Sequence, residues 1–129
     1  MKHVRYLFVA GLLLSASLSI GCPAVLVGGA AGGGAVAYIR GELKATEEVS
    51  LNRAWKAAQM AMSDLEFTIT DKEKDAFDGR IHASGAGDKA IDVALKKISP
   101  ARTEIRIRVG LFGDESLSRQ ILEGIKKHF

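Results

Sequence analysis

Hydrophobic and polar residues follow three successive patterns along the second half of this chain. After Ser50, apolar residues recur every three or four positions, at Leu51, Trp55, Ala58, Met62 and Leu65. This spacing places them on one face of a helix, and Ser50 is a typical N-cap residue. The same spacing returns after Asp114, another typical N-cap, and predicts a second helix that ends the chain.

Between these helices, apolar and polar residues alternate, which is typical of strands with one buried face. Four such strands are predicted, at 67–70, 77–84, 91–95 and 103–109, and a weaker one at 42–49 precedes the first helix. Short connections favour antiparallel hairpins in sequence order. We therefore expect an α+β fold: an antiparallel sheet of four to five strands, in the order β-α-β-β-β-β-α, with both helices packed on one face.

The N-terminal third has a different composition and divides into two segments. Residues 1–21 begin with Lys2 and Arg5, continue with a short apolar run at 6–14, and end in small residues. This is the layout of a secretory signal peptide. Residues 22–39 form a second segment, and 40–129 are predicted to be a single domain.

The chain's only cysteine, Cys22, directly follows this signal, after Ser19, Ile20 and Gly21. The arrangement resembles a bacterial lipoprotein signal. The resemblance implies cleavage between Gly21 and Cys22, attachment of a glyceryl lipid to the Cys22 thiol, and acylation of the new amine. Several acyl chains anchor a protein stably. The alternative is an ordinary signal peptide or an uncleaved helix in which the cysteine is incidental.

Residues 23–39 are rich in glycine and alanine and carry no charge. Gly28 with Gly32, and Gly29 with Gly33, have the spacing of small residues at membrane helix contacts. Many glycines also weaken a helix, so the segment is interpreted as a flexible tether that lies against the lipid surface. A glycine-zipper type of membrane-associated oligomer is the alternative.

Charge and cysteine content limit the classes of function. The full chain has 18 basic and 15 acidic residues, and without Lys2 and Arg5 the 16 remaining basic residues leave a net charge of +1. Such a balance gives little support to nucleic-acid binding, and we expect no nucleic-acid partner. A single cysteine also excludes an intramolecular disulfide.

Four arginines are candidates for a partner or anion surface. Arg80, beside His82, is expected on one strand and Arg106 and Arg108 on another, where they would meet phospholipid or lipopolysaccharide phosphates. Arg119 either pairs with Asp114 or Glu115 within its helix or reaches an external anion. The alternative for the strand residues is a mixed, solvated sheet face, because Asp78, Asp92 and Glu104 are interspersed.

The corner Gly110–Asp114 joins the last strand to the last helix. The glycines permit unusual backbone angles, and Leu111 and Phe112 are expected to plug the end of the sheet. The alternative is a lip that contacts a partner or ligand.

No enzyme signature is evident. The dinucleotide-like glycines at 85–87 precede a strand where a helix is needed, and His82 and His128 have no cysteine nearby. We expect no catalytic residues, cofactor or metal; a pocket joining Ser84, His82 and a carboxylate would favour a hydrolase instead.

One further segment is distinctive: Arg108–Glu115 followed by Leu117–Leu122, which read RVGLFGDE and LSRQIL. Together with Arg40–Leu43, the glycine-rich stretch and the tryptophan-bearing helix, it resembles an uncharacterised bacterial lipoprotein family, a domain of unknown function. The resemblance implies a cell-envelope protein, held in the outer membrane by acylated Cys22 and facing the periplasm. It implies no activity or ligand. Separately from the resemblance, we expect a non-enzymatic module that binds another envelope protein.

Overall fold

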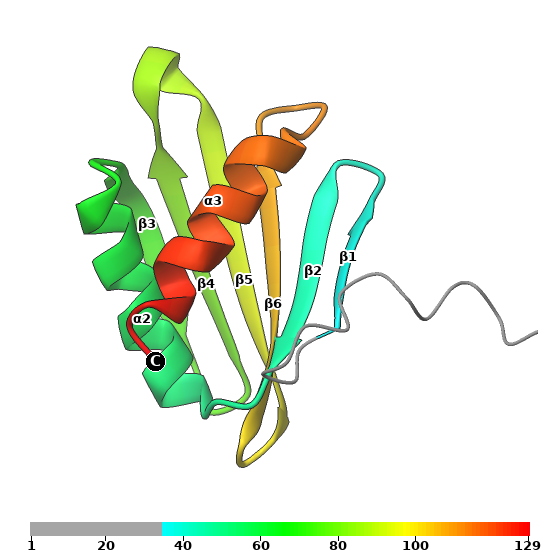
Figure 1. Ribbon diagram of the computed structural model, residues 1–129. Helices are drawn as coiled ribbons and strands as arrows, with labels where there is room; N and C mark the ends of the chain where they lie inside the picture. The colour runs from blue at the N-terminus through cyan, green and yellow to red at the C-terminus, as the bar shows by residue number, and fades with distance from the viewer. Residues whose placement is uncertain (1–34) are drawn as a thin grey trace, which may run out of the picture.

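Six strands form one antiparallel sheet, and two helices pack on the same face of it (Figure 1). The computed structural model describes residues 35–129. In chain order the elements are β1 (Val36–Ile39), β2 (Glu42–Glu47), α2 (Leu51–Asp64), β3 (Thr68–Lys74), β4 (Asp78–Ser84), β5 (Ala90–Ser99), β6 (Arg102–Val109) and α3 (Glu115–Lys126). The strands are ordered β1-β2-β6-β5-β4-β3 across the sheet.

The predicted α+β class, the antiparallel sheet and the two helices on one face are confirmed. Strands β3 to β6 pair with their sequence neighbours, as the short connections indicate. Both caps form: the Ser50 side chain accepts a hydrogen bond from the Arg53 backbone N–H at 3.3 Å, and Asp114 Oδ1 accepts one from the Leu117 N–H at 3.0 Å. Each cap satisfies a backbone donor at the start of a helix that has no partner within the helix.

The sheet has one strand more than the sequence indicated. Strand β1 comes from the end of the 22–39 segment, and pairs with β2 from Val36 opposite Ala45 to Ile39 opposite Glu42. Val36 and Tyr38 pack against the core, which the glycine-rich composition before them concealed. Arg40 (φ 53°) and Gly41 (φ 82°) form the turn, both in the left-handed region that a tight two-residue hairpin requires.

Apolar residues between the sheet and the helices form a single core. Small residues on α2, namely Ala54, Ala57, Ala58 and Ala61, allow this helix to approach the sheet closely. Trp55 is half-buried and lies across Gly79 of β4: a Cβ on Gly79 would come within 2.9 Å of the Trp55 ring. Trp55 therefore belongs to the apolar face of α2, as expected, and Gly79 makes room for its ring.

We expect Gly79→Ala to lower the free energy of unfolding by about 1 to 3 kcal/mol, because the added methyl group overpacks this contact. Gly124→Ala is the matched control. Gly124 lies within α3, where a Cβ would meet neighbours at 3.6 Å, an ordinary contact distance. This control should raise stability by about 0.5 to 1 kcal/mol through helix propensity. Chemical unfolding followed by circular dichroism measures both, and equal effects of the two variants would contradict the account.

One carboxyl group lies within the core. Glu47, at the end of β2, is 4% exposed, and its Oε1 atom has no hydrogen-bond partner among residues 35–129. Burial raises the pKa of this carboxyl, Lys126 on α3 acts in the opposite direction, and Glu123 adds to the rise. The native state therefore holds the proton more tightly than the unfolded chain does, and ionisation of Glu47 costs stability.

The raised pKa of Glu47 makes the free energy of unfolding depend on pH. From about pH 4.5, where Glu47 ionises in the unfolded chain, stability should fall as pH rises toward the raised native pKa. We expect Glu47→Gln to remove this loss, so that the variant unfolds at a higher temperature than the parent at pH 7 but not at pH 4. Thermal unfolding at both pH values tests this, and an identical difference at both would contradict it.

Candidate functional site

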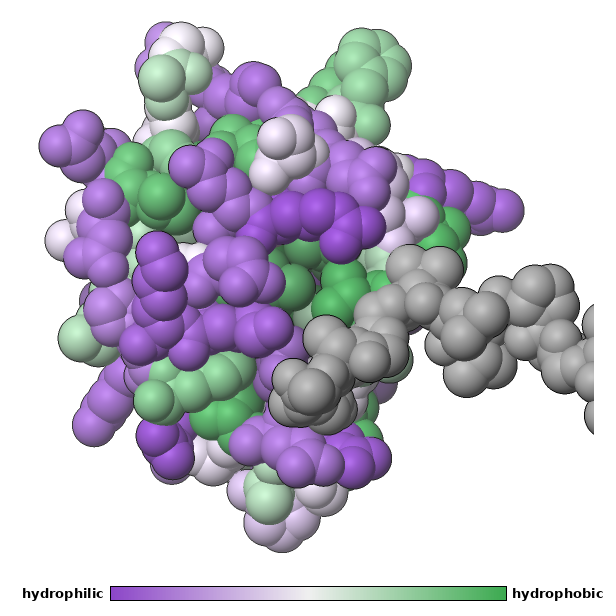
Figure 2. All heavy atoms as spheres, viewed as in Figure 1, coloured by the Kyte–Doolittle hydropathy of each residue, from purple (hydrophilic) through white to green (hydrophobic). Residues whose placement is uncertain are grey.

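The corner between β6 and α3 carries the most exposed apolar side chains of the described residues. Leu111 is 83% exposed and Phe112 is 89% exposed, so the expectation that they plug the end of the sheet is wrong. Figure 2 shows a hydrophobic projection at this end of the molecule. Ile39, at the end of β1, is 62% exposed and precedes the Arg40–Gly41 turn, which contacts this corner through Gly41. We call Ile39, Leu111 and Phe112 the apolar tip.

Backbone contacts hold the apolar tip in place. Gly110 (φ 68°) and Gly113 (φ 83°) reverse the chain on either side of Leu111 and Phe112. A Cβ on Gly113 would lie 2.4 Å from the Gly41 Cα, and one on Gly41 would lie 2.7 Å from the Phe112 carbonyl oxygen. The β1–β2 turn and the corner therefore touch backbone to backbone, a contact that excludes any side chain at Gly41 or Gly113.

Polar groups around the apolar tip add to this support. Arg108 Nη2 donates a hydrogen bond to the Arg40 carbonyl oxygen at 3.1 Å. Lys89 Nζ pairs with Asp114 Oδ2 at 3.2 Å, which joins the β4–β5 turn to the start of α3. The Asp114 carboxyl also accepts from the Leu117 N–H, and these hydrogen bonds lower its pKa. The tip is thus a fixed apolar projection.

The sheet face opposite the helices is the second candidate surface. Strand pairing places its side chains in rows across β2, β6, β5 and β4. One row reads Lys44, Arg106, Ala94, Arg80, and the next reads Glu42, Arg108, Asp92, His82. Arg80 and Arg106 thus stand on either side of Ala94, whereas Arg108 lies in the other row between two carboxylates. Of the four candidate arginines, Arg80 and Arg106 therefore lie in the same row of the sheet.

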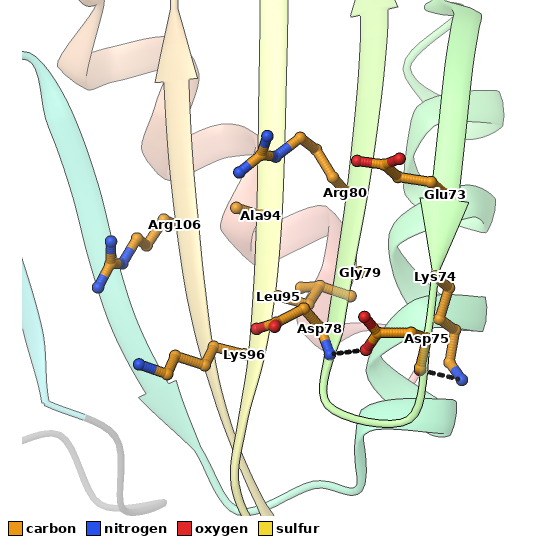
Figure 3. Close-up of a pocket in the computed structure, with 10 residues that line it drawn as sticks. All are labelled: Glu73, Lys74, Asp75, Asp78, Gly79, Arg80, Ala94, Leu95, Lys96 and Arg106. Carbon is orange, nitrogen blue, oxygen red and sulfur yellow. Dashed lines mark hydrogen bonds between the residues drawn. The ribbon is translucent and has the colours of Figure 1, made fainter.

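An open hollow of about 480 Å³ lies on this face around Ala94. Its lining includes the basic residues Lys74, Arg80, Lys96 and Arg106 and the acidic residues Glu73, Asp75 and Asp78. Figure 3 shows Arg80 and Asp78 reaching from β4 toward β5, while Arg106 and Lys96 lie on the other side of Ala94. We call this the sheet hollow.

Several charges of the sheet hollow are already engaged. Arg106 Nε donates to Glu104 Oε1 at 2.6 Å, and this contact raises the pKa of Arg106. Asp75 Oδ1 accepts from the backbone N–H groups of Phe77 at 2.7 Å and Asp78 at 2.8 Å, which lowers the pKa of Asp75. Arg80 and Lys96 form no ion pair with any residue in the described range.

Arg119 lies apart from the sheet hollow. It is on α3, on the helix-covered side, and its Nε and Nη2 atoms donate to Glu115 Oε1 at 3.1 and 2.9 Å. Of the two alternatives predicted for Arg119, the structure shows the local ion pair with Glu115 within one helix turn.

A histidine and an aspartate meet on the open face. His82 Nδ1 contacts Asp92 Oδ1, from the adjacent strand β5. Ser84 lies two residues along the same strand, but no hydrogen bond joins it to His82 among residues 35–129, and none of the three lines the sheet hollow. The β4–β5 register that places Ser84 opposite Ala90 also places His82 opposite Asp92. The His82–Asp92 pair could therefore have been predicted from this hairpin alone.

Other candidates lie partly or wholly outside the described residues. Within residues 35–129, no group of three or more histidine, cysteine or acidic residues is arranged to hold a metal ion. Nor does this range contain a helix of the length and apolar character needed to cross a membrane. Gly21, Cys22, the 1–21 signal and Gly28–Gly34 are outside the range, so lipid attachment, the tether and the glycine-zipper alternative stay predictions.

A family model described as "Protein of unknown function (DUF3568)" matches residues 5–128. No curated protein matches the chain.

Proposed function

Because the chain belongs to the DUF3568 family, a family of unknown function, we propose its role from its own sites: a lipid-anchored module of the cell envelope that binds another envelope protein without catalysing a reaction. The observation that carries the proposal is the exposure of Leu111 and Phe112 on a fixed corner. The lipid anchor is Cys22, at the end of a lipoprotein-like signal. In this proposal the outer membrane holds the anchor and the domain faces the periplasm.

The position of the apolar tip suits this arrangement. The N-terminal segment enters the sheet at the start of β1, and the tip adjoins the other end of β1, beyond Ile39. Twelve residues lie between Cys22 and Ala35, and the 13 Cα-to-Cα steps reach at most about 45 Å at 3.3 to 3.6 Å per residue. The tip therefore lies at the opposite end of β1 from the residue where the N-terminal segment joins this strand, a position that suits contact with a partner.

The chemistry of the apolar tip favours a protein partner. Large apolar side chains at the centre of a contact dominate binding energy between proteins. A rigid backbone also reduces the entropy lost on association, and the Gly41–Gly113 contact supplies that rigidity here. We propose that the partner offers an apolar pocket that receives Leu111 and Phe112.

The open face supports a role without catalysis. Both His82 and Asp92 are about half exposed, and Ser84 does not contact them. An activated nucleophile requires a base within hydrogen-bonding reach and shielding from water, and this pair offers neither to Ser84.

Lipid attachment is tested with labelled palmitate in cells. The wild-type chain should incorporate the label and fractionate with the outer membrane, and Cys22→Ala should lose the label and keep residues 1–21, because lipid attachment precedes cleavage in the lipoprotein pathway that the signal resembles. Pro23→Ala is the control and should behave as the wild type. Label retained by Cys22→Ala would contradict the anchor.

The partner is tested by photocrosslinking from the apolar tip in intact cells. A photoreactive residue at Phe112 should yield one discrete adduct with another protein, and Leu111→Ser should reduce that adduct severalfold while leaving the unfolding temperature unchanged. The matched control site is Phe77, which is also exposed but lies in the β3–β4 turn. The same adduct from both sites, an adduct with a second copy of this chain, or only abundant lipoproteins would each contradict the proposal.

A further inference from the structure

The large apolar side chains that residues 35–129 expose to solvent gather at the two ends of the sheet. Three of the six form the apolar tip, and Met60 lies on α2. The other two are Phe77, which is 67% exposed in the β3–β4 turn, and Ile98, which is 49% exposed just before the β5–β6 turn. Exposed apolar residues that occur together, unlike scattered ones, indicate an interaction surface.

Backbone contacts place Phe77 and Ile98 on neighbouring strands at one end of the sheet. The Lys97 N–H donates to the Phe77 carbonyl oxygen at 2.8 Å, and Ile98 follows directly. A bulge between Lys97 and Ser99 leaves Ile98 outside the regular pairing of β5 with β6. The β3–β4 turn is held by Asp75, whose Oδ1 atom accepts from the Phe77 N–H at 2.7 Å. We call Ala76–Phe77 and Ile98–Ala101 the paired loops.

The paired loops carry no charge of their own, and the charges around them are balanced. The two loops read AF and ISPA. One row further into the sheet, Lys96 stands between Asp78 and Glu104. At the β5–β6 turn, Arg102 Nη2 contacts Glu48 Oε1 at 3.5 Å. Apolar side chains, rather than a net charge, therefore distinguish this end of the molecule.

The N-terminal segment joins the sheet at this same end. The Ala35 carbonyl oxygen accepts from the Thr46 N–H at 3.1 Å, and Thr46 lies in the row of these three charged residues, next to the row of Phe77. Figure 1 shows the start of β1 and the β5–β6 turn at one end of the sheet, and the corner before α3 at the other. A lipid on Cys22 would therefore hold the end with the paired loops nearest the membrane, within at most about 45 Å of chain.

We propose that the paired loops insert into the interfacial region of the bilayer that holds the anchor. The inference rests on the lipid anchor of the proposed function and adds a second membrane contact. Apolar side chains bury at the boundary between headgroups and acyl chains, and the long side chains of Lys97 and Arg102 keep their charges at headgroup level. Because the anchor already confines the domain near the bilayer, insertion is an intramolecular step, for which two apolar side chains suffice. Docking at this end directs the apolar tip away from the membrane.

Fluorescence quenching of the lipid-modified full chain in phosphatidylcholine vesicles tests the docking. One chain carries a fluorophore on Ala101→Cys, in the paired loops, and another carries it on Leu111→Cys, in the apolar tip. Lipid attachment blocks Cys22, so the dye reacts only with the new thiol. The Ala101 probe should be quenched by a nitroxide on the lipid acyl chains and shielded from aqueous iodide, and the Leu111 probe should show the reverse.

Two variants in the chain with the Ala101 probe assign the contact to apolar side chains. Phe77→Ser should lower the docking equilibrium constant about tenfold, the effect expected when one large apolar side chain is removed from a lipid contact. Met60→Ser, which removes an exposed apolar side chain on α2, is the matched control and should change nothing. Added salt should also leave the quenching unchanged, because the charges around the paired loops balance. Unfolding temperatures show that each variant is folded.

Vesicle flotation separates failure of the docking from failure of the anchor. An Ala101 probe open to iodide in chains that float with the vesicles would overturn the docking and leave the anchor intact, whereas a chain that does not float would overturn both. Shielding from iodide without quenching by lipid would show that a second copy covers the paired loops, and would also overturn the docking. So would an equal effect of Phe77→Ser and Met60→Ser, or docking that requires anionic lipid and is lost in salt. Loss of the apolar-tip adduct, by contrast, would leave these results unchanged.

Discussion

The structure depends on burial of one face of the sheet only. The helices cover the face that carries Leu43, Ile81, Val93 and Ile107, and the alternation along each strand sends the intervening charged residues to the other face. A slip of one residue in any pairing would move a row of arginines or carboxylates into the core. The arrangement of Arg80, Ala94 and Arg106 is therefore fixed by the core, because the same register sets both faces.

Local patterns in the sequence predicted most of this fold, and distant contacts account for what they missed. The caps, the helix faces and the hairpins from β3 to β6 depend on neighbouring residues, so spacing alone identified them. Pairing of β2 with β6 joins segments about 60 residues apart, and nothing in either strand specifies it. β1 depends in turn on β2, and its four residues were hidden at the end of a glycine-rich run.

The same difference between local and distant contacts decides which parts of the candidate sites could be predicted. The position of His82 opposite Asp92 follows from the register of one hairpin, β4–β5. The row from Arg80 to Arg106 also requires the register of β5 with β6, and placing Lys44 in this row requires the distant pairing of β2 with β6. The exposure of Leu111 and Phe112 was not predictable from their type, since large apolar residues near a sheet end are usually buried. Their orientation is set by the Gly41–Gly113 contact, which only the folded chain creates.

The apolar tip relies on short-range recognition. Residues 35–129 contain 16 basic and 15 acidic residues, so the domain has almost no net field to attract a partner or ligand from a distance. Selectivity must then come from local geometry. At the apolar tip this is a backbone contact that fixes exposed side chains.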